Sequence, residues 1–299
     1  MFENITMLVD NVSLAFQSSP WLLYSTVLLF GLCAGSFLNV VAYRLPLMME
    51  RDWKSECHEF LELDKPVFDD NLQTMSLSTP ASTCPCCGHK IRFWENIPVI
   101  SYMFLRGRCS SCKADISIQY PLVELLTGVA SICVAYTFGA TWQTLAALIF
   151  TWMLIAMSLI DIKKQLLPDN MTLPLLWLGI FCSFFGLFTD LKSSIIGAMA
   201  GYLILWSVYQ LFKIVTKKEG MGFGDFKLLA TLGAWAGYSF LPQIILVSSV
   251  VGSIVGITML ITGKTKQQQP IPFGPYLAVA GWIALLWGDR INDFYLSFI

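Results

Sequence analysis

The chain has 299 residues, of which 56% are hydrophobic and only 13% are charged, and its mean hydropathy is +0.63. A soluble domain carries roughly a quarter charged residues, so this composition excludes an ordinary soluble protein and indicates several transmembrane helices. An outer-membrane β-barrel is also excluded, because residues 241–262 are apolar on every helical face. We expect membrane lipid as the surroundings and no nucleic-acid partner.

Apolar runs bounded by charge, proline or glycine predict an all-α polytopic membrane protein with about eight transmembrane helices. The run at 226–238 is too short for a full crossing, so it tilts, dips part way or joins its neighbour. The predicted spans are 21–43, 121–138, 142–160, 171–188, 194–215, 226–238, 241–262 and 274–292.

Basic residues are divided unequally between the two sides of these spans. If the first span runs from outside to inside, only Lys192 and Arg290 lie outside, and the other 17 of the 19 basic residues lie inside. Because positively charged loops stay in the cytoplasm, both termini are expected outside it. Residues 1–20 contain no basic residue, so the first span is expected to be a retained anchor and not a cleaved signal peptide.

One segment, 45–120, interrupts the apolar pattern and is expected to be a cytosolic insert, since it carries 18 of the 39 charged residues. We therefore divide the chain into an N-terminal segment with the first span (1–44), this insert, and a membrane domain (121–299). Within the insert, the acidic stretch 50–70 holds eight acids and three bases.

Four cysteines in the insert have the spacing of a metal site. Cys84, Cys87, Cys109 and Cys112 form C-x2-C-x21-C-x2-C, in which two knuckle turns present thiolates to one tetrahedral ion, as in a zinc ribbon. A cytosolic location disfavours disulfides as the alternative. Four sulfur ligands close the coordination shell, so the predicted zinc ion is structural; Cys86 is a spare thiol in the first knuckle.

Two carboxylates lie at the predicted cytoplasmic edge of the membrane. Asp161 follows an apolar run, and Asp225 ends GMGFGD just before another. Two such acids brought close together share a proton, so that one polarises a carbonyl and the other activates water, as in an aspartic peptidase. Gly222 and Gly224 are expected to let the backbone pass close to a substrate strand.

Structural interpretations of these acids stay open. Asp225 would then be a helix N-cap, and Asp161 would pair with one of the lysines at 163–164. Glu124 lies in the first turn of a span, where a carboxylate complements the helix dipole. Asp169 is expected to help position its loop.

Seven segments spread over nearly the whole chain form one specific set. They are GSFLNVVAYRLP (35–46), CPCCGHKI (84–91), ENIPVISYMFLRGRC (95–109), YPLVELLTG (120–128), DIKKQLLPDNMTLPLLWLG (161–179), GMGFGDFKLLATLGAWAG (220–237) and PFGPYLA (272–278). With these segments in this order, the chain resembles the bacterial type IV prepilin peptidases, the bifunctional leader peptidases and N-methyltransferases of pilus and type II secretion systems.

The resemblance implies that Asp161 and Asp225 are the catalytic pair and that the four cysteines bind zinc. The implied reaction removes the short basic leader from type IV prepilins or type II secretion pseudopilins. Cleavage follows a glycine at the cytoplasmic face of the bacterial inner membrane. The new N-terminal residue, usually Phe, is then methylated with S-adenosylmethionine. No GxGxxG segment is present to bind this donor. The resemblance places the donor around Glu95, Asn96, Ile97 and Pro98.

Other interpretations remain. An intramembrane protease of the presenilin type is disfavoured, since Leu159 and Ile160 precede the first acid where those enzymes have YD. A polytopic transporter, or a pilus or secretion assembly scaffold with a structural zinc module, would use intramembrane acids differently. A methyltransferase without peptidase activity is a third possibility. The acidic stretch 50–70 either attracts the basic leader or is a solvated linker.

Overall fold

The computed structural model describes residues 15–297 except 17, 65, 67, 69 and 263–270. In these residues all regular structure is helical, apart from two isolated β-bridges. The helices are α2 (Pro20–Phe60), α3 (Asp70–Gln73), η1 (Phe93–Asn96), α4 (Ile100–Phe104), α5 (Gln119–Phe138), α6 (Trp142–Lys164), α7 (Asp169–Phe184), α8 (Leu191–Thr216), α9 (Phe223–Ala236), η2 (Tyr238–Phe240), α10 (Leu241–Ile261) and α11 (Gly274–Leu296).

A helix occupies each of the predicted spans, which confirms the all-helical membrane fold. Five helices in the described part of the chain are long and apolar enough to cross a membrane: α2, α5, α6, α8 and the segment Tyr238–Ile261 that contains α10. The 16 residues of α7 and the 14 of α9 fall short of that length. Eight crossings therefore remain a prediction.

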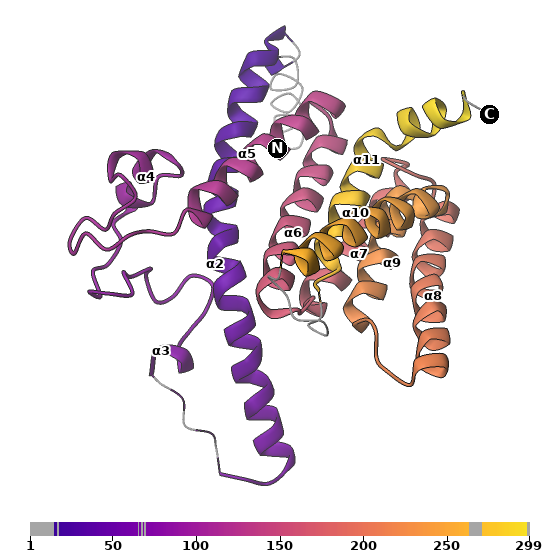
Figure 1. Ribbon diagram of the computed structural model, residues 1–299. Coiled ribbons are helices and arrows are strands. Elements are labelled where there is room, and N and C mark those ends of the chain that lie inside the picture. Colours follow the sequence, from indigo (N-terminus) through magenta and orange to yellow (C-terminus); the bar gives the residue numbers. More distant parts are fainter. Residues whose placement is uncertain are drawn as a thin grey trace, which may run out of the picture. The chain divides into compact units, whose positions relative to one another are not determined.

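The chain forms two compact units, Met1–Ala140 and Thr141–Ile299. In the first unit α5 packs along α2, as Figure 1 shows. Glycines bring the two helices together: a Cβ added at Gly31 would lie 2.6 Å from Ser131 Oγ, and one at Gly35 would lie 2.7 Å from the Cα of Glu124. Small residues at such a crossing allow close backbone contact between membrane helices. The division of the chain at residues 44 and 120 stays a prediction.

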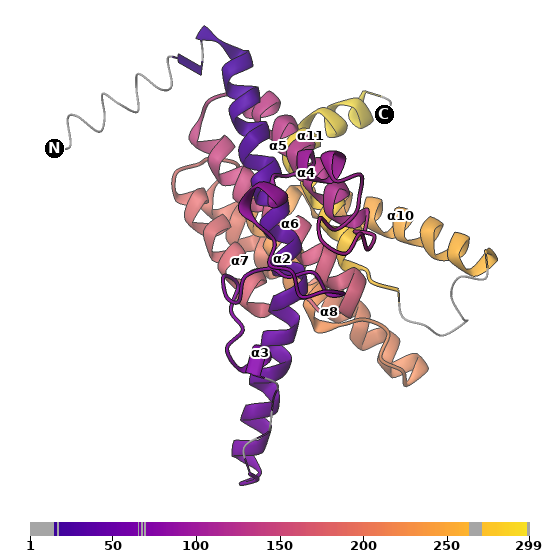
Figure 2. The ribbon, with the colours of Figure 1, turned by 90° about the vertical axis from the view of Figure 1, so that its left-hand side faces the viewer.

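Helix α2 continues well beyond the predicted span. Its 41 residues rise about 60 Å, twice the roughly 30 Å hydrocarbon thickness, and Pro46 lies within it. Figures 1 and 2 show its C-terminal half running past α5. The insert therefore begins as a helix, supported by a Lys54–Glu50 ion pair of 3.0 Å.

Arginines tie the insert to α2. Arg44 is buried and donates to the carbonyl oxygens of Ser76 and Pro80, at 3.0 and 2.7 Å. Two turns further on the same side, Arg51 donates to the backbone of Leu72, Gln73 and Met75. Of the acidic stretch, all the acids from Glu50 to Asp64 are exposed, and residues 65, 67 and 69 lie outside the described part.

Helix α9 forms the core of the second unit. It packs against α7, α8 and α11, and every residue from Leu228 to Ala236 is buried (Figure 1). On the α8 side, Gly233 faces Gly197, where a Cβ on either residue would collide with the carbonyl group of the other. The helix ends at Gly237, whose φ of 90° favours glycine.

Candidate active site and metal centre

Asp161 lies in the last turn of α6, with 5% of its surface exposed. Its Oδ2 accepts a hydrogen bond of 3.0 Å from the backbone N–H of Gly274, the first residue of α11. No ion pair joins Asp161 to either lysine at 163–164 among the described residues. A buried carboxylate held by a backbone donor does not match the interfacial ion pair of the structural interpretation.

Asp225 is the third residue of α9 and is 8% exposed. The N-cap of this helix is Gly222, so the interpretation of Asp225 as the N-cap is wrong. Asp225 instead occupies the first turn, with its carboxyl group close enough to Asp161 for the two charges to interact. The second unit thus brings together two buried acids that are 64 positions apart in the sequence.

Leu167 fills the space between the two acid-bearing segments. It lies in the loop after α6 and is buried. A Cβ added at Gly224 would lie 2.8 Å from Leu167 Cβ, and one at Gly274 would lie 3.3 Å from Leu167 Cδ1 and 2.6 Å from Asp161 Oδ2. Gly224 therefore makes room for Leu167. Sequence reasoning missed Leu167 and Gly274, although both lie in the segments that carry the family resemblance.

A row of polar contacts fixes α9 against α7. Lys227 Nζ lies 2.7 Å from both carboxylate oxygens of Asp169. Asp169 is the first residue of α7, directly after the loop that it was expected to position. Four residues after Lys227, the Thr231 hydroxyl donates to the carbonyl oxygen of Thr172 at 3.2 Å. Four residues after Thr231, the indole N–H of Trp235 donates to the carbonyl oxygen of Leu175 at 2.8 Å. These contacts set the position of the helix that carries Asp225.

The four predicted metal ligands converge. The Sγ atoms of Cys84, Cys87, Cys109 and Cys112 all lie within 4.8 Å of one another. Four sulfurs bound at about 2.3 Å to one tetrahedral ion are separated by about 3.8 Å. The Sγ atoms of Cys84 and Cys112 lie 3.8 Å apart, so the cluster fits a metal ion. Cys86 is exposed and outside the cluster.

The two cysteine knuckles repeat the same backbone pattern. Cys84 N–H donates to the carbonyl of His89, and Cys109 N–H donates to that of Ala114, at 2.9 and 2.8 Å. The β-bridges Thr83–Lys90 and Arg108–Asp115 close the two turns. Backbone N–H groups of Cys86 and Cys87 lower the pKa of the Cys84 thiol to about 6, which favours the thiolate that a metal requires.

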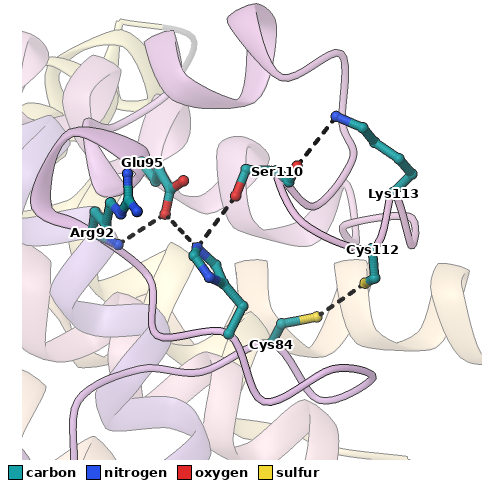
Figure 3. A network of polar contacts seen from close by, with 7 residues as sticks. Cys84, Arg92, Glu95, Ser110, Cys112 and Lys113 are labelled. Carbon is teal, nitrogen blue, oxygen red and sulfur yellow. Dashed lines mark hydrogen bonds and ion pairs between the residues drawn. The ribbon is translucent and has the colours of Figure 1, made fainter.

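Glu95 connects the cysteine module to the segment predicted to bind the methyl donor. Its Oε2 accepts the N–H of Arg92 at 2.9 Å and lies 3.2 Å from His89 Nε2, which lies 3.3 Å from Ser110 Oγ (Figure 3). The Arg92 N–H and the Ser110 hydroxyl lower the pKa of Glu95 to about 2. Asn96 ends η1, and Ile97 and Pro98 follow it toward α4.

Two family models match the chain. The model described as Bacterial Peptidase A24 N-terminal domain matches residues 29–138, and the model described as Type IV leader peptidase family matches residues 148–257. The first match contains the cysteine cluster and the second contains both buried acids.

Curated proteins match over nearly the whole chain. A protein named prepilin leader peptidase/N-methyltransferase from Stutzerimonas stutzeri is 57% identical over 281 residues, which are 94% of this chain and 96% of that protein. A protein of the same name from Pseudomonas aeruginosa is also 57% identical, over 94% of this chain and 96% of that protein. A protein of the same name from Neisseria gonorrhoeae is 49% identical, over 87% of this chain and 89% of that protein. No solved structure matches.

Proposed function

This chain belongs to the family of prepilin leader peptidase/N-methyltransferases, and we propose that it cleaves the basic leader from type IV prepilins or type II secretion pseudopilins and then methylates the new N-terminus. The observation that carries the peptidase assignment is the pair of buried acids, Asp161 and Asp225, at the ends of α6 and α9. The burial of ionisable acids in a membrane protein costs free energy, so such acids are taken as functional by default.

The two carboxyl groups perform acid–base catalysis. One is ionised and accepts a proton from water, whose oxygen attacks the carbonyl carbon of the leader's last glycine; the other is protonated and donates a hydrogen bond to that glycine's carbonyl oxygen. Collapse of the tetrahedral intermediate transfers a proton to the leaving amine. The N–H of Gly274 holds Asp161 in place through these steps.

The second reaction transfers a methyl group to the released α-amine. Bound S-adenosylmethionine would supply the methyl group as an electrophile. Glu95, Asn96, Ile97 and Pro98 are the residues proposed to hold it. Glu95 supports this assignment because its hydrogen bonds anchor one end of the segment to the cysteine module.

Zinc is the ion we assign to the four-cysteine cluster. The sulfur donor set and the near-tetrahedral spacing suit Zn²⁺, and four protein ligands leave no open position for a substrate. The ion would stabilise a module whose own helices, η1 and α4, have only four and five residues, so its role is structural.

The positive-inside rule supports a location in the bacterial inner membrane, with both acids and the cysteine module on the cytoplasmic side and both termini periplasmic. A leader that stays in the cytoplasm while the prepilin helix remains in the bilayer meets the acids at this face.

The test is leader cleavage by Asp161→Asn and Asp225→Asn, measured by mass spectrometry of a prepilin incubated with the purified chain and S-adenosylmethionine. Each variant should lose cleavage by at least about 1,000-fold and keep its zinc content, while Asp289→Asn, which changes an exposed acid, should cleave normally. Full processing by either active-site variant would contradict the peptidase assignment and favour a scaffold or transporter role.

A further inference from the structure

The loop before α4 contains an uncommon backbone turn. Val99 has a φ of 60° and a ψ of −48°, and the N–H of Ile100 donates to the carbonyl oxygen of Pro98 at 2.6 Å. These values describe a γ-turn with positive φ at its centre, which is rare and strained. A β-branched residue in this conformation persists only where neighbouring contacts hold it, and such positions gather at functional sites.

Glu124 makes the contact that holds this turn. Its Oε2 accepts the N–H of Val99 at 2.7 Å, although Glu124 lies 25 residues later, in α5. The carboxyl group is buried and also contacts Ser36 of α2. The absence of a side chain at Gly35 lets α2 approach Glu124 this closely. Helix α5 begins at Gln119 and has no acid in its first turn, so the expectation that Glu124 lies there and complements the helix dipole is wrong.

The turn and Glu95 together fix a short segment at both ends. At one end Glu95 is bonded to the Arg92 backbone and to His89 of the cysteine module. At the other end Val99 is bonded to Glu124. Between these anchors lie only Asn96, Ile97 and Pro98, three of the four residues proposed to hold the methyl donor.

We propose that Glu124 is a positioning residue for methyl transfer, which fixes the backbone of residues 95–98 by accepting the N–H of Val99. This inference rests on the proposed function, because it takes 95–98 as the donor site. Packing of α2 on α5 does not need the carboxylate, since glycine contacts already join these helices and an apolar side chain would be easier to bury than a charge.

The experiment separates the two reactions in the full-length chain. Methylation is measured with S-adenosylmethionine and a pilin whose leader has already been removed, and cleavage is measured with the uncleaved prepilin. Glu124→Ala should raise KM for S-adenosylmethionine about tenfold, the effect of losing one charge-assisted hydrogen bond. Hydrogen exchange of the Val99 amide should accelerate by a similar factor. Cleavage should stay within about twofold of the wild type.

Two matched variants complete the design. Glu124→Gln keeps an oxygen that accepts the Val99 N–H, so KM should return to near the wild-type value; Asp289→Asn changes an exposed acid of α11 and should have no effect. An unchanged KM in Glu124→Ala with faster Val99 exchange would overturn the inference, as would equal losses in the Ala and Gln variants. A wild-type chain that cleaves but transfers no methyl group would instead overturn the proposed function, and this inference with it.

Discussion

At the scale of single residues, the position of Asp161 depends on a glycine 113 residues further along the chain. Gly274 donates its N–H to Asp161 Oδ2, and a Cβ on Gly274 would lie 2.6 Å from that same oxygen. Gly274→Ala should therefore displace the carboxyl group. Because a displacement of about 1 Å costs on the order of 100-fold in rate, we expect kcat for leader cleavage to fall by that factor with little change in KM.

Gly252→Ala is the matched control for Gly274→Ala. A Cβ there would meet Tyr276 Cδ2 at 3.2 Å, so it touches the same end of α11 without reaching either acid. Its kcat should remain within about threefold of the wild type, in the range of a mild packing change. Normal turnover by Gly274→Ala would show that the Gly274 contact does not position Asp161.

The sequence predicts the chemical groups of the site better than the residues that hold those groups in place. Asp161 and Asp225 are identifiable because acids are scarce in apolar runs, and the cysteines because their spacing is local. The contacts of Gly274 and Leu167 are tertiary, so no spacing rule predicts them. The same reason explains why Glu124 was assigned to its own helix when it bonds to a distant backbone N–H.

At the scale of elements, α9 owes its position to contacts on two opposite sides. Toward α7, residues Lys227, Thr231 and Trp235 recur at intervals of four and so lie on one helical face. Toward α8, Gly233 lies directly against the backbone at Gly197. Helix α9 therefore cannot move away from α7 without colliding with the backbone of α8.

Gly233→Ala tests this arrangement. The added methyl group would collide with the Gly197 carbonyl, a backbone group that cannot change rotamer. We expect a loss of about 3 kcal/mol in the free energy of unfolding, the upper part of the usual overpacking range, measured by thermal denaturation in detergent. Gly256→Ala, whose Cβ would meet only the flexible end of Ile271, should change stability by less than about 1 kcal/mol. Equal stabilities would contradict the close approach.

Element boundaries were predicted less well than element existence. Hydropathy ends the first span near residue 43, yet α2 continues to Phe60 because charged residues such as Glu50 and Lys54 are good helix formers. The shortness of the run at 226–238 was visible in the sequence. The reason for this shortness was not visible in the sequence. Helix α9 is buried among α7, α8 and α11, and this packing depends on contacts across the whole unit.

At the scale of the whole molecule, the two units contain different sets of candidate functional residues. The first contains the cysteine module, the segment 95–98 and Glu124, whereas the second contains both buried acids. Because the residues proposed for the two reactions lie in different units, we expect the variants above to affect methylation and cleavage separately.

Helix α8 provides a direct test of the membrane orientation. Its 26 residues rise about 39 Å, enough to cross the bilayer, with exposed Lys192 at its start and exposed Lys217 and Lys218 directly after its end. The charge distribution puts Lys192 outside and the other two in the cytoplasm. A membrane-impermeant amine reagent should therefore label only Lys192 of these three in intact spheroplasts, and all three after lysis, as read by peptide mass spectrometry. Labelling of Lys217 and Lys218 before lysis would reverse the orientation and move the two acids to the periplasmic face.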